Sequence, residues 1–543
     1  MQRFATLLDR LLYMSSRNGK LTLLAQYFAT TPDPDRGYAL AALTGSLDLG
    51  SAKAGIVRGL ITERVDPVLF GWSYDFVGDL AETVSLMWPS PPPHQKINAP
   101  SPSLGDVVDT LQAARKSEIP SHLSGWMDRM EAEARWALLK LITGGLRVGV
   151  SARLAKTALA AYGGQDVAEI EEIWHGLTPP YQSLFQWLDG DGEIPAVADG
   201  AGFRPLMLAN PLEDRDLETV TIADYRAEWK WDGIRVQLAA RNGEKRLYSR
   251  TGDDIGRAFP DVLDAVAFDA VVDGELLVSV PGASAPFADN QLGSFNDLQQ
   301  RLNRKTVSKK MLSDAPAFVR VYDILFDGKE DLRALPFDER RHRLERWVSQ
   351  NPCSRMDLSE QIPFSGLDEL MELRETARAT DREGLMLKHR DSPYLAGRPR
   401  GPWFKWKRDA LVADCVLMYA QRGHGKRSSF YSDYTFGAWE NGSLVPVGKA
   451  YSGFTDEELK SLDKWVRDRT TARYGPVREV EPGLVFEVAF DSVHFSKRHK
   501  SGVAMRFPRI SRIRWDKPID EADTVDSLRA MITADSNGVE RAG

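Results

Sequence analysis

The spacing of apolar residues changes near residue 204. From Met1 to about Phe203, apolar residues recur at intervals of three and four, as in FATLLDRLLYM and RWALLKLITGGL, a spacing typical of amphipathic helices. The proline-rich stretch from Pro89 to Ser103 cannot continue a helix, so we expect an exposed loop there. Residues 1–204 therefore predict an all-α domain.

After about Pro205, short alternating or β-branched runs separated by turn residues replace this pattern. The runs are AEWKW, IRVQLAA, KRLYSR, ELLVSV, FVRVYDIL and GLMLK, each typical of a β-strand. Asn242 and Gly243 stand between two of them and predict a hairpin turn. We interpret residues 205–409 as an α+β domain.

A second β-rich block extends from about Ala413 to Lys517. It contains CVLMYA, YTFGAWENGSLVPVG and GLVFEVAF, with a helix candidate in DEELKSLDKWVRDR. This length and spacing suit a small closed β-barrel over residues 410–520. The chain after Pro518 is acidic and then polar, so we expect residues 521–543 to form a tail that frays.

The composition fits a multi-domain globular protein. A chain of 543 residues is longer than one core normally supports, and it is 43% hydrophobic and 27% charged. No apolar run approaches the roughly 20 residues that span a bilayer, so we expect no membrane association. The only cysteines, Cys353 and Cys415, are too few for a disulfide framework, which favours a reducing, cytoplasmic setting. We expect a monomer. Since the net charge is −7, any surface for a polyanion must be a local basic patch.

The candidate chemistry begins at EWKWDGIR, where Lys230 is followed by Asp232 and Gly233 at the end of a predicted strand. A Lys-x-Asp-Gly string alone is weak evidence for a catalytic lysine, since it arises by chance in about one chain in ten. An exposed lysine at a turn would explain it equally well. Six further strings follow in order: SRTG, DGEL, VYDIL, EGLMLK, WFKWK and RFPRISRIR. Their order and spacing make coincidence negligible.

From Arg204 to Pro518 this ordered set resembles the ATP-dependent DNA ligases, a family of covalent nucleotidyltransferases. The resemblance implies a multi-domain fold with an ATP-grasp-like nucleotidyltransferase core at 205–409 and an OB-fold at 410–520. Residues 1–204 then resemble the helical DNA-binding domain of the larger ligases. ATP, Mg²⁺ or Mn²⁺, and nicked duplex DNA are the implied cofactors and partner, in DNA repair or replication.

The resemblance also implies catalytic roles. Lys230 would attack the α-phosphate of ATP and form a lysyl-AMP, and Asp232 would orient the turn. A lysine amine is nucleophilic only when deprotonated, which requires nearby cations or partial desolvation. Lys405 and Lys407 would contact the α-phosphate. Phosphoryl transfer depends on positioning and charge neutralisation, so cations at these positions suit the chemistry.

Two acidic residues, Glu275 and Glu383, would lie around the metal and the nucleotide ribose. Taken singly, each could be an ordinary carboxylate at a strand end. Their places within the ordered strings favour the functional interpretation.

The nucleotide itself would be recognised by further side chains. Arg235 and Arg250 would contact the nucleotide or the 5′-phosphate of the nick, and Glu228 would accept from the adenine amino group. Tyr322 stands where the family places an aromatic ring against adenine, although a tyrosine in an apolar strand is often a core residue.

One position departs from the family pattern. Six residues before Lys405, where the family has an arginine, this chain has Pro399. A slip of one residue would restore the role, and we favour Arg400 over Arg398.

Basic residues outside the core are candidates for contacts with DNA or pyrophosphate. Arg147 and Arg153 flank a glycine-containing turn in the helical region, although surface arginines on a helix pair would look the same. The loop GHGKRSS fails the Walker pattern and is interpreted as a DNA-facing loop. The remaining candidates are Lys426, Arg427, Lys497 and Arg498 for DNA, and Arg506 and Arg509 for the pyrophosphate of ATP.

Two alternatives remain. An RNA ligase or a capping-type nucleotidyltransferase shares the Lys-x-Asp-Gly nucleophile, but the helical region and the terminal RFPRISRIR string favour a DNA ligase. A nick-binding scaffold without catalysis would keep the fold, although all the predicted catalytic residues are present. An NAD-dependent ligase is disfavoured because two cysteines cannot form its four-cysteine zinc module.

Overall fold

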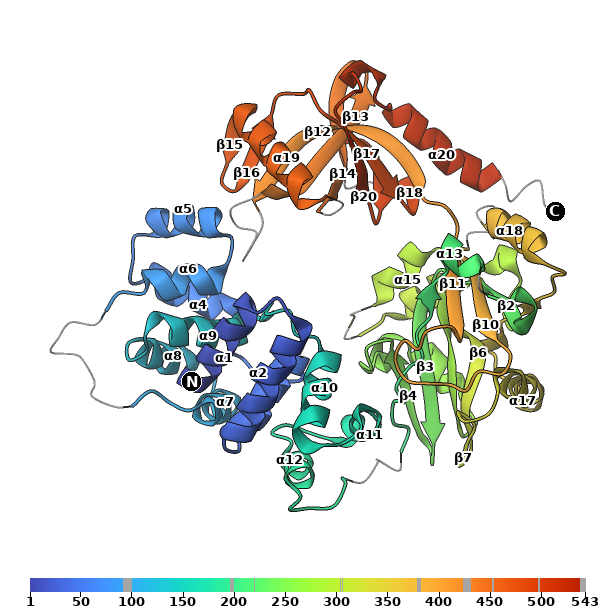
Figure 1. Cartoon of the computed structure of the whole chain (residues 1–543), viewed down its shortest axis with the longest axis horizontal. Helices are drawn as coiled ribbons and strands as arrows, with labels where there is room; N and C mark the ends of the chain where they lie inside the picture. Colours follow the sequence, from blue (N-terminus) through green and yellow to red (C-terminus); the bar gives the residue numbers. More distant parts are fainter. Residues whose placement is uncertain are drawn as a thin grey trace. The chain divides into compact units, whose positions relative to one another are not determined.

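The computed structural model describes residues 1–90, 100–195, 200–218, 220–302, 304, 306–377, 382–422, 431–451, 454–496 and 499–537. The chain divides into two compact units (Figure 1). One contains Met1–Ile170, Leu177–Pro195 and Ala410–Ile532, and the other contains Glu171–Gly176 and Ala196–Asp409. In the part of the chain that is described, no helix has both the length and the apolar character to cross a membrane.

The N-terminal region is helical, as predicted. In α1 (Gln2–Tyr13), Phe4, Leu7, Leu8 and Leu11 are buried, which is the three-and-four spacing expected of one helix face. The remaining helices are α2 (Arg17–Thr30), α3 (Asp35–Thr44), α4 (Ala54–Thr62), α5 (Pro67–Val77), α6 (Leu80–Met87), α7 (Leu104–Ala113), α8 (Ile119–Met127), α9 (Ala132–Thr143), α10 (Ala152–Gly163), α11 (Val167–Ile173) and α12 (Gln182–Asp189).

The predicted proline-rich loop falls between α6 and α7. Residues 91–99 of this stretch lie outside the described residues. On its C-terminal side, Ser103 begins α7 with a capping box, in which its hydroxyl accepts from the backbone N–H of Asp106.

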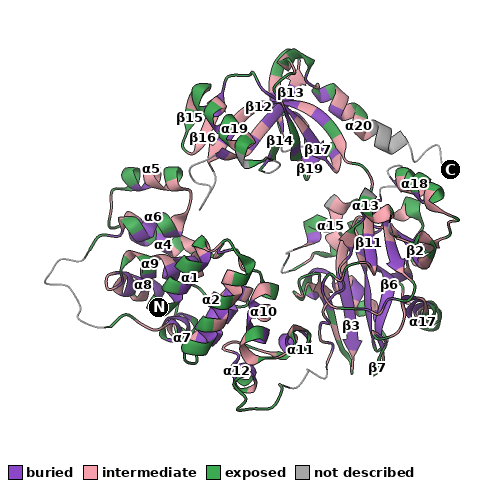
Figure 2. Cartoon of the chain, viewed as in Figure 1, coloured by how far each residue is buried: buried purple, intermediate pink, exposed green. Residues whose placement is uncertain are grey.

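The second unit contains two mainly antiparallel sheets. In the first, the order is β1 (Asn210–Pro211), β11 (Trp403–Lys407), β10 (Gly384–His389), β2 (Tyr225–Lys230) and β9 (Gln361–Ile362). In the second, the order is β4 (Glu244–Ser249), β3 (Ile234–Arg241), β5 (Ala270–Val278), β6 (Ala317–Asp327) and β7 (Glu330–Asp331), with β8 (Met356–Leu358) parallel to β6. Strand β6 is almost entirely buried, and residues 236–240 in the middle of β3 are buried as well (Figure 2).

The helices of this unit are α13 (Asp214–Leu217), α14 (Pro260–Ala265), α15 (Phe295–Arg301), α16 (Lys309–Asp314), α17 (Phe337–Gln350) and α18 (Leu367–Thr376). The predicted hairpin is confirmed: β3 pairs with β4 and the turn residues Asn242 and Gly243 have φ of +52° and +80°. Glu172, in α11, forms ion pairs with Arg204 at 3.0 Å and Arg333 at 2.9 Å. Because Glu171–Gly176 belong to this unit, both ion pairs lie within it.

The C-terminal region is strand-rich. Its main sheet has the order β14 (Ser443–Ala450), β13 (Tyr431–Glu440), β12 (Leu411–Arg422), β16 (Val477–Val480) and β15 (Thr470–Tyr474), and β17 (Val485–Phe490) joins β12 to β20 (Arg509–Arg514). Strands β18 (Ser492–Phe495) and β19 (Val503–Arg506) form a separate pair. The predicted helix is confirmed as α19 (Asp456–Asp468), which begins with a Thr455–Glu458 capping box.

The expectation that the tail frays after Pro518 was wrong for residues 525–537. They form helix α20 (Val525–Asn537), in which Val525 and Leu528 are fully buried in the core of the strand-rich region. Their apolar side chains, three residues apart, supply enough burial to hold the helix despite its polar neighbours. Residues 538–543 lie outside the described residues.

Candidate active site

Lys230 is the last residue of β2 and lies where this strand meets the start of β10. Gly384 pairs with Lys230 across the strands, and the backbone N–H of Glu383 donates to the Lys230 carbonyl at 2.9 Å. This register puts the two side chains together, with Lys230 Nζ 2.7 Å from Glu383 Oε2. Two strings far apart in the sequence therefore meet at one strand end.

The turn after Lys230 requires glycine. A Cβ atom at Gly233 would lie 2.5 Å from the carbonyl oxygen of Leu276 and 2.7 Å from Cγ of Glu275. The backbone can approach β5 this closely only without a side chain. The Lys-x-Asp-Gly string thus brings Glu275 beside the nucleophile candidate, and the half-buried Asp232 lies within the same turn.

Side chains from both sheets line one cavity of about 410 Å³, a size suited to a nucleotide. It brings together most of the residues that the sequence predicts for this domain. They are Glu228, Lys230, Arg235, Arg250, Glu275, Tyr322, Glu383, Lys405 and Lys407.

Three charged side chains form what we call the mouth cluster: Lys230, Glu383 and Lys407. Lys407 Nζ lies 3.1 Å from the Glu383 oxygen that Lys230 also contacts. Burial alone would raise the pKa of Glu383, but the charges of Lys230 and Lys407 outweigh it and lower that pKa to about 2. Partial burial, together with the charges of Arg398 and Lys230, lowers the pKa of the neighbouring Lys405. This concentration of positive charge suits a phosphate group.

Glu275 differs from Glu383 although both are candidate metal ligands. Burial raises the pKa of Glu275 to about 8, since the attraction of Lys230 only partly opposes it and the charge of Glu383 adds to it. Among the described residues, no three His, Cys, Asp or Glu side chains gather to hold a metal. Two carboxylates alone are a poor site, but Mg²⁺ commonly binds through one or two carboxylates together with substrate phosphates. The donor set therefore fits Mg²⁺ that arrives with a nucleotide.

Asp273 fixes the position of the Arg235 side chain. Its Nε and Nη2 donate to the two Asp273 oxygens at 3.1 and 2.6 Å, and Tyr394 Oη donates to Asp273 at 2.7 Å. The planar guanidinium is thereby fixed along the cavity wall. Sequence reasoning missed Asp273 and Tyr394, although Asp273 begins the DGEL string.

Two further residues of the lining, Glu228 and Lys388, form what we call the floor pair. Lys388 Nζ lies 3.1 Å from each Glu228 oxygen, and both side chains are at most 2% exposed. The Tyr322 ring, half-buried and part of the cavity lining, lies 4.5 Å from Lys388 Nζ. Sequence reasoning missed Lys388, whose only signal was its place at the end of EGLMLK.

One of the two arginines that the sequence offered for the position before Lys405 lines the cavity. Arg398 lines the cavity and the favoured Arg400 does not, although both residues are exposed. Arg250 also lines it, and burial together with the charges of Arg235 and Arg398 lowers the pKa of Arg250. The loop between β10 and β11 thus places Arg398 at the cavity.

In the helical region, the turn that carries Arg147 has an unusual backbone. Arg147 itself has a φ of +52°, and Gly144, Gly145 and Gly149 have φ between +67° and +77°. Lys20 Nζ donates to the carbonyl oxygens of Val148 and Gly149 at 2.6 and 2.9 Å. The turn is therefore fixed to α2.

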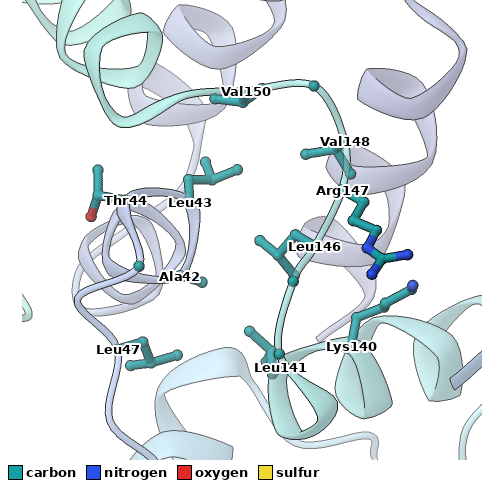
Figure 3. A pocket seen from close by; sticks show the side chains of 14 residues that line it. Ala42, Leu43, Thr44, Leu47, Lys140, Leu141, Leu146, Arg147, Val148 and Val150 are labelled. Carbon is teal, nitrogen blue, oxygen red and sulfur yellow. The ribbon is translucent and has the colours of Figure 1, made fainter. Parts of the chain in front are cut away.

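Two cavities adjoin this turn. The first, of about 430 Å³, has leucine side chains around its opening while Arg147 and Lys140 point away from it (Figure 3). The second, of about 690 Å³, is lined by Arg17, Lys20, Arg147 and Arg153. The predicted pair Arg147 and Arg153 therefore shares one basic hollow.

In the strand-rich region, Arg506 ends β19 and Arg509 begins β20. Arg509 Nη1 lies 3.4 Å from Asp491, and Arg506 lies against the exposed ring of Phe507. The other four DNA-binding candidates, Lys426, Arg427, Lys497 and Arg498, lie outside the described residues.

Comparisons with known proteins identify the family of the chain. The family described as "ATP dependent DNA ligase domain" matches residues 206–407, and "ATP dependent DNA ligase C terminal region" matches residues 427–517. A "Probable DNA ligase" of Koribacter versatilis (strain Ellin345) is 31% identical over 97% of this chain and 95% of its own length. "DNA ligase 1" of Korarchaeum cryptofilum (strain OPF8) is 30% identical over 98% of both chains.

Among solved structures, "Pmar-Lig_PreS3" superposes with a TM-score of 0.60 over 94% of this chain and 99% of its own. At 16% identity it supports the fold alone. The full-length relatives and the matched domains establish more: the chain belongs to the ATP-dependent DNA ligases, the enzymes that seal nicks in DNA.

Proposed function

We propose that Lys230 carries AMP between ATP and the nick. The neutral amine attacks the α-phosphorus, an N–P bond forms, the bond to the bridging oxygen of the β-phosphate breaks, and pyrophosphate leaves. The 5′-phosphate of the nick then takes the AMP, and the adjacent 3′-hydroxyl displaces it to close the phosphodiester. The observation that carries this proposal is the place of Lys230 in a cavity rich in cations, 2.7 Å from Glu383.

The cations of the cavity would neutralise the phosphates. Lys405 and Lys407 lie beside Lys230 in the lining and are assigned to the α-phosphate. For the arginine of the loop before β11 we assign Arg398 rather than Arg400, because only Arg398 lines the cavity. Arg250, also in the lining, is assigned to the nucleotide or the nick phosphate.

The base and ribose would lie deeper in the cavity. Arg235, fixed by Asp273, retains Nη1 for the nucleotide, and Tyr322 offers a ring face to adenine. Glu228 at the floor is assigned to the adenine amino group. Asp232 is assigned to the turn that presents Lys230.

Mg²⁺ would be held by Glu275 and Glu383 together with phosphate oxygens of the nucleotide. The ion would supply charge stabilisation at the phosphates. Glu383 must then exchange Lys230 for the metal, which would release the amine from its ion pair.

The remaining regions are assigned to DNA. We propose that residues 1–204 bind the duplex through the hollow lined by Arg147 and Arg153, where backbone contacts are independent of base sequence. Residues 410–520 would be an OB-fold that presents Arg506 and Arg509 to pyrophosphate and, in a second position, grips DNA. If so, replacing Arg147 and Arg153 reduces the salt dependence of nick binding while adenylylation persists.

The test uses ATP labelled at the α-phosphate, with Mg²⁺, followed by denaturing electrophoresis. We expect covalent label on the wild type, none on Lys230→Ala, and discharge of the label when nicked duplex DNA is added. Label that discharges only onto nicked RNA would support an RNA ligase instead. Absence of label with both ATP and GTP would support the scaffold without catalysis.

A further inference from the structure

The floor pair contains a lysine whose hydrogens are matched by protein acceptors. Lys388 Nζ lies 3.1 Å from each oxygen of Glu228 and 3.3 Å from the backbone carbonyl oxygen of Tyr322. An ammonium group has three N–H bonds, so these acceptors equal its donors in number. The rings of Tyr322, Phe337 and Trp403 surround the same nitrogen at 4.5, 4.9 and 4.7 Å.

This arrangement leaves Glu228 as the polar group that the pair offers to a ligand. Each carboxylate oxygen has a second lone pair, whereas the ammonium has no hydrogen to spare. Burial raises the pKa of Glu228 and lowers the pKa of Lys388, and in each case the charge of the partner opposes burial. Lys388 is therefore the main support for the negative charge of Glu228, with Arg341 Nη1 farther away at 3.8 Å.

We propose that Lys388 is a positioning residue that sets the choice of nucleobase. By holding Glu228 as a buried hydrogen-bond acceptor, it favours a base with an exocyclic amino group, as in adenine. It disfavours a base with a carbonyl oxygen at the same position, as in hypoxanthine or guanine, since two acceptors would face each other in a buried site. The inference rests on the proposed placement of the base against Glu228.

The physical consequence of removing Lys388 is a change in the character of Glu228. Without the ammonium, a carboxylate that is 2% exposed takes up a proton rather than remain an isolated buried charge. A protonated carboxyl donates as well as accepts, so it can pair with a carbonyl oxygen. The loss of Lys388 should thus relax the choice of base, which a general weakening of the fold would not do.

The test compares adenylylation of the full-length enzyme by ATP and by inosine triphosphate, each labelled at the α-phosphate. Hypoxanthine keeps the shape of adenine but has a carbonyl oxygen in place of the amino group. In Lys388→Met we expect the ratio of kcat/KM for ATP over inosine triphosphate to fall on the order of 10- to 100-fold, the cost of one mispaired buried hydrogen bond. A parallel loss with both nucleotides would overturn the inference.

Arg301→Met is the matched control. Arg301 is another buried cation of the same unit, 1% exposed and paired with Asp261, and it does not line the cavity. We expect this variant to lose stability while the nucleotide ratio remains that of the wild type. A ratio that falls equally in Arg301→Met would mean that any damage to the unit relaxes the choice, and the inference would fail.

If Lys388→Met does not fold, the double variant Glu228→Gln with Lys388→Met replaces it. This variant removes both charges, and its amide offers a donor as well as an acceptor. We expect the same fall in the ratio, and a wild-type ratio would refute the role of the pair. The proposed function fails separately: wild-type enzyme that takes no label from ATP contradicts the role of Lys230, whereas labelled enzyme with an unchanged ratio in the variants contradicts only this inference.

Discussion

The nucleotide cavity contains two lysine–glutamate pairs that differ mainly in burial. In the floor pair, Lys388 and Glu228 are 1% and 2% exposed, and in the mouth cluster Lys230 and Glu383 are 22% and 21% exposed. A fully buried pair cannot separate without leaving an uncompensated charge, whereas a pair near solvent can exchange partners. Both pairs are ion pairs, so ion pairing does not distinguish them. The comparison indicates that burial distinguishes a charged residue that maintains the site from one that reacts.

The largest effect that this comparison predicts is on Lys230. We expect Lys230→Ala to lower adenylylation on the order of 10⁴-fold or more, since no other group supplies the nucleophile. The same variant should still seal a nick whose 5′-phosphate already carries AMP, because that step needs only the surrounding cations. Gel assays of the two half-reactions measure this division. Failure to seal the pre-adenylylated nick would show that Lys230 also has a structural role.

The second prediction concerns stability. Lys388→Met should cost about 3 to 5 kcal/mol of unfolding free energy because it leaves Glu228 buried without its partner. Lys230→Met should cost less than about 1 kcal/mol because its pair is partly solvated. Denaturant unfolding followed by tryptophan fluorescence gives both values. Equal losses of unfolding free energy would contradict the distinction between the floor pair and the mouth cluster.

The members of the mouth cluster were named from the sequence because they stand in the ordered strings that resemble the ligase family. Lys230, Glu383 and Lys407 lie at strand ends, where the chain leaves a sheet and short polar strings interrupt apolar runs. Glycine marks these positions as well, because the backbone at Gly233 approaches β5 too closely for any side chain. The strings themselves are visible along the chain, whereas the reason for the glycine appears only once β5 is placed beside it.

The floor pair was not predictable in the same way. Lys388 lies inside a buried strand, and its contact with Glu228 depends on the register of β10 against β2, which the sequence does not determine. The choice between Arg398 and Arg400 depends on the path of a loop for the same reason. For α20, the acidic and polar neighbours concealed Val525 and Leu528, whose burial only the folded strand-rich region provides.

The third prediction tests whether the mouth cluster also serves the metal. Glu383→Gln keeps the shape of the side chain but removes the charge, so we expect the Mg²⁺ concentration for half-maximal adenylylation to rise on the order of 10- to 100-fold. Titration with Mg²⁺ at saturating ATP measures the shift. Glu345→Gln is the control, since this carboxylate pairs with Arg341 and does not line the cavity. An unchanged Mg²⁺ requirement in Glu383→Gln would restrict Glu383 to pairing with Lys230.

The smallest predicted effect concerns the two arginines of the loop before β11. Arg398 lines the cavity and its charge helps to lower the pKa of Lys405, whereas Arg400, two residues away, does not line the cavity. We expect Arg398→Ala to lower kcat/KM for ATP by roughly 5- to 20-fold, the loss of one charge-assisted contact, and Arg400→Ala to change it less than about twofold. Rates of label transfer from ATP decide between them. The reverse order would mean that the loop before β11 moves Arg400 to the cavity when nucleotide binds. The cations around the mouth cluster would then be complete only with substrate bound, unlike the floor pair.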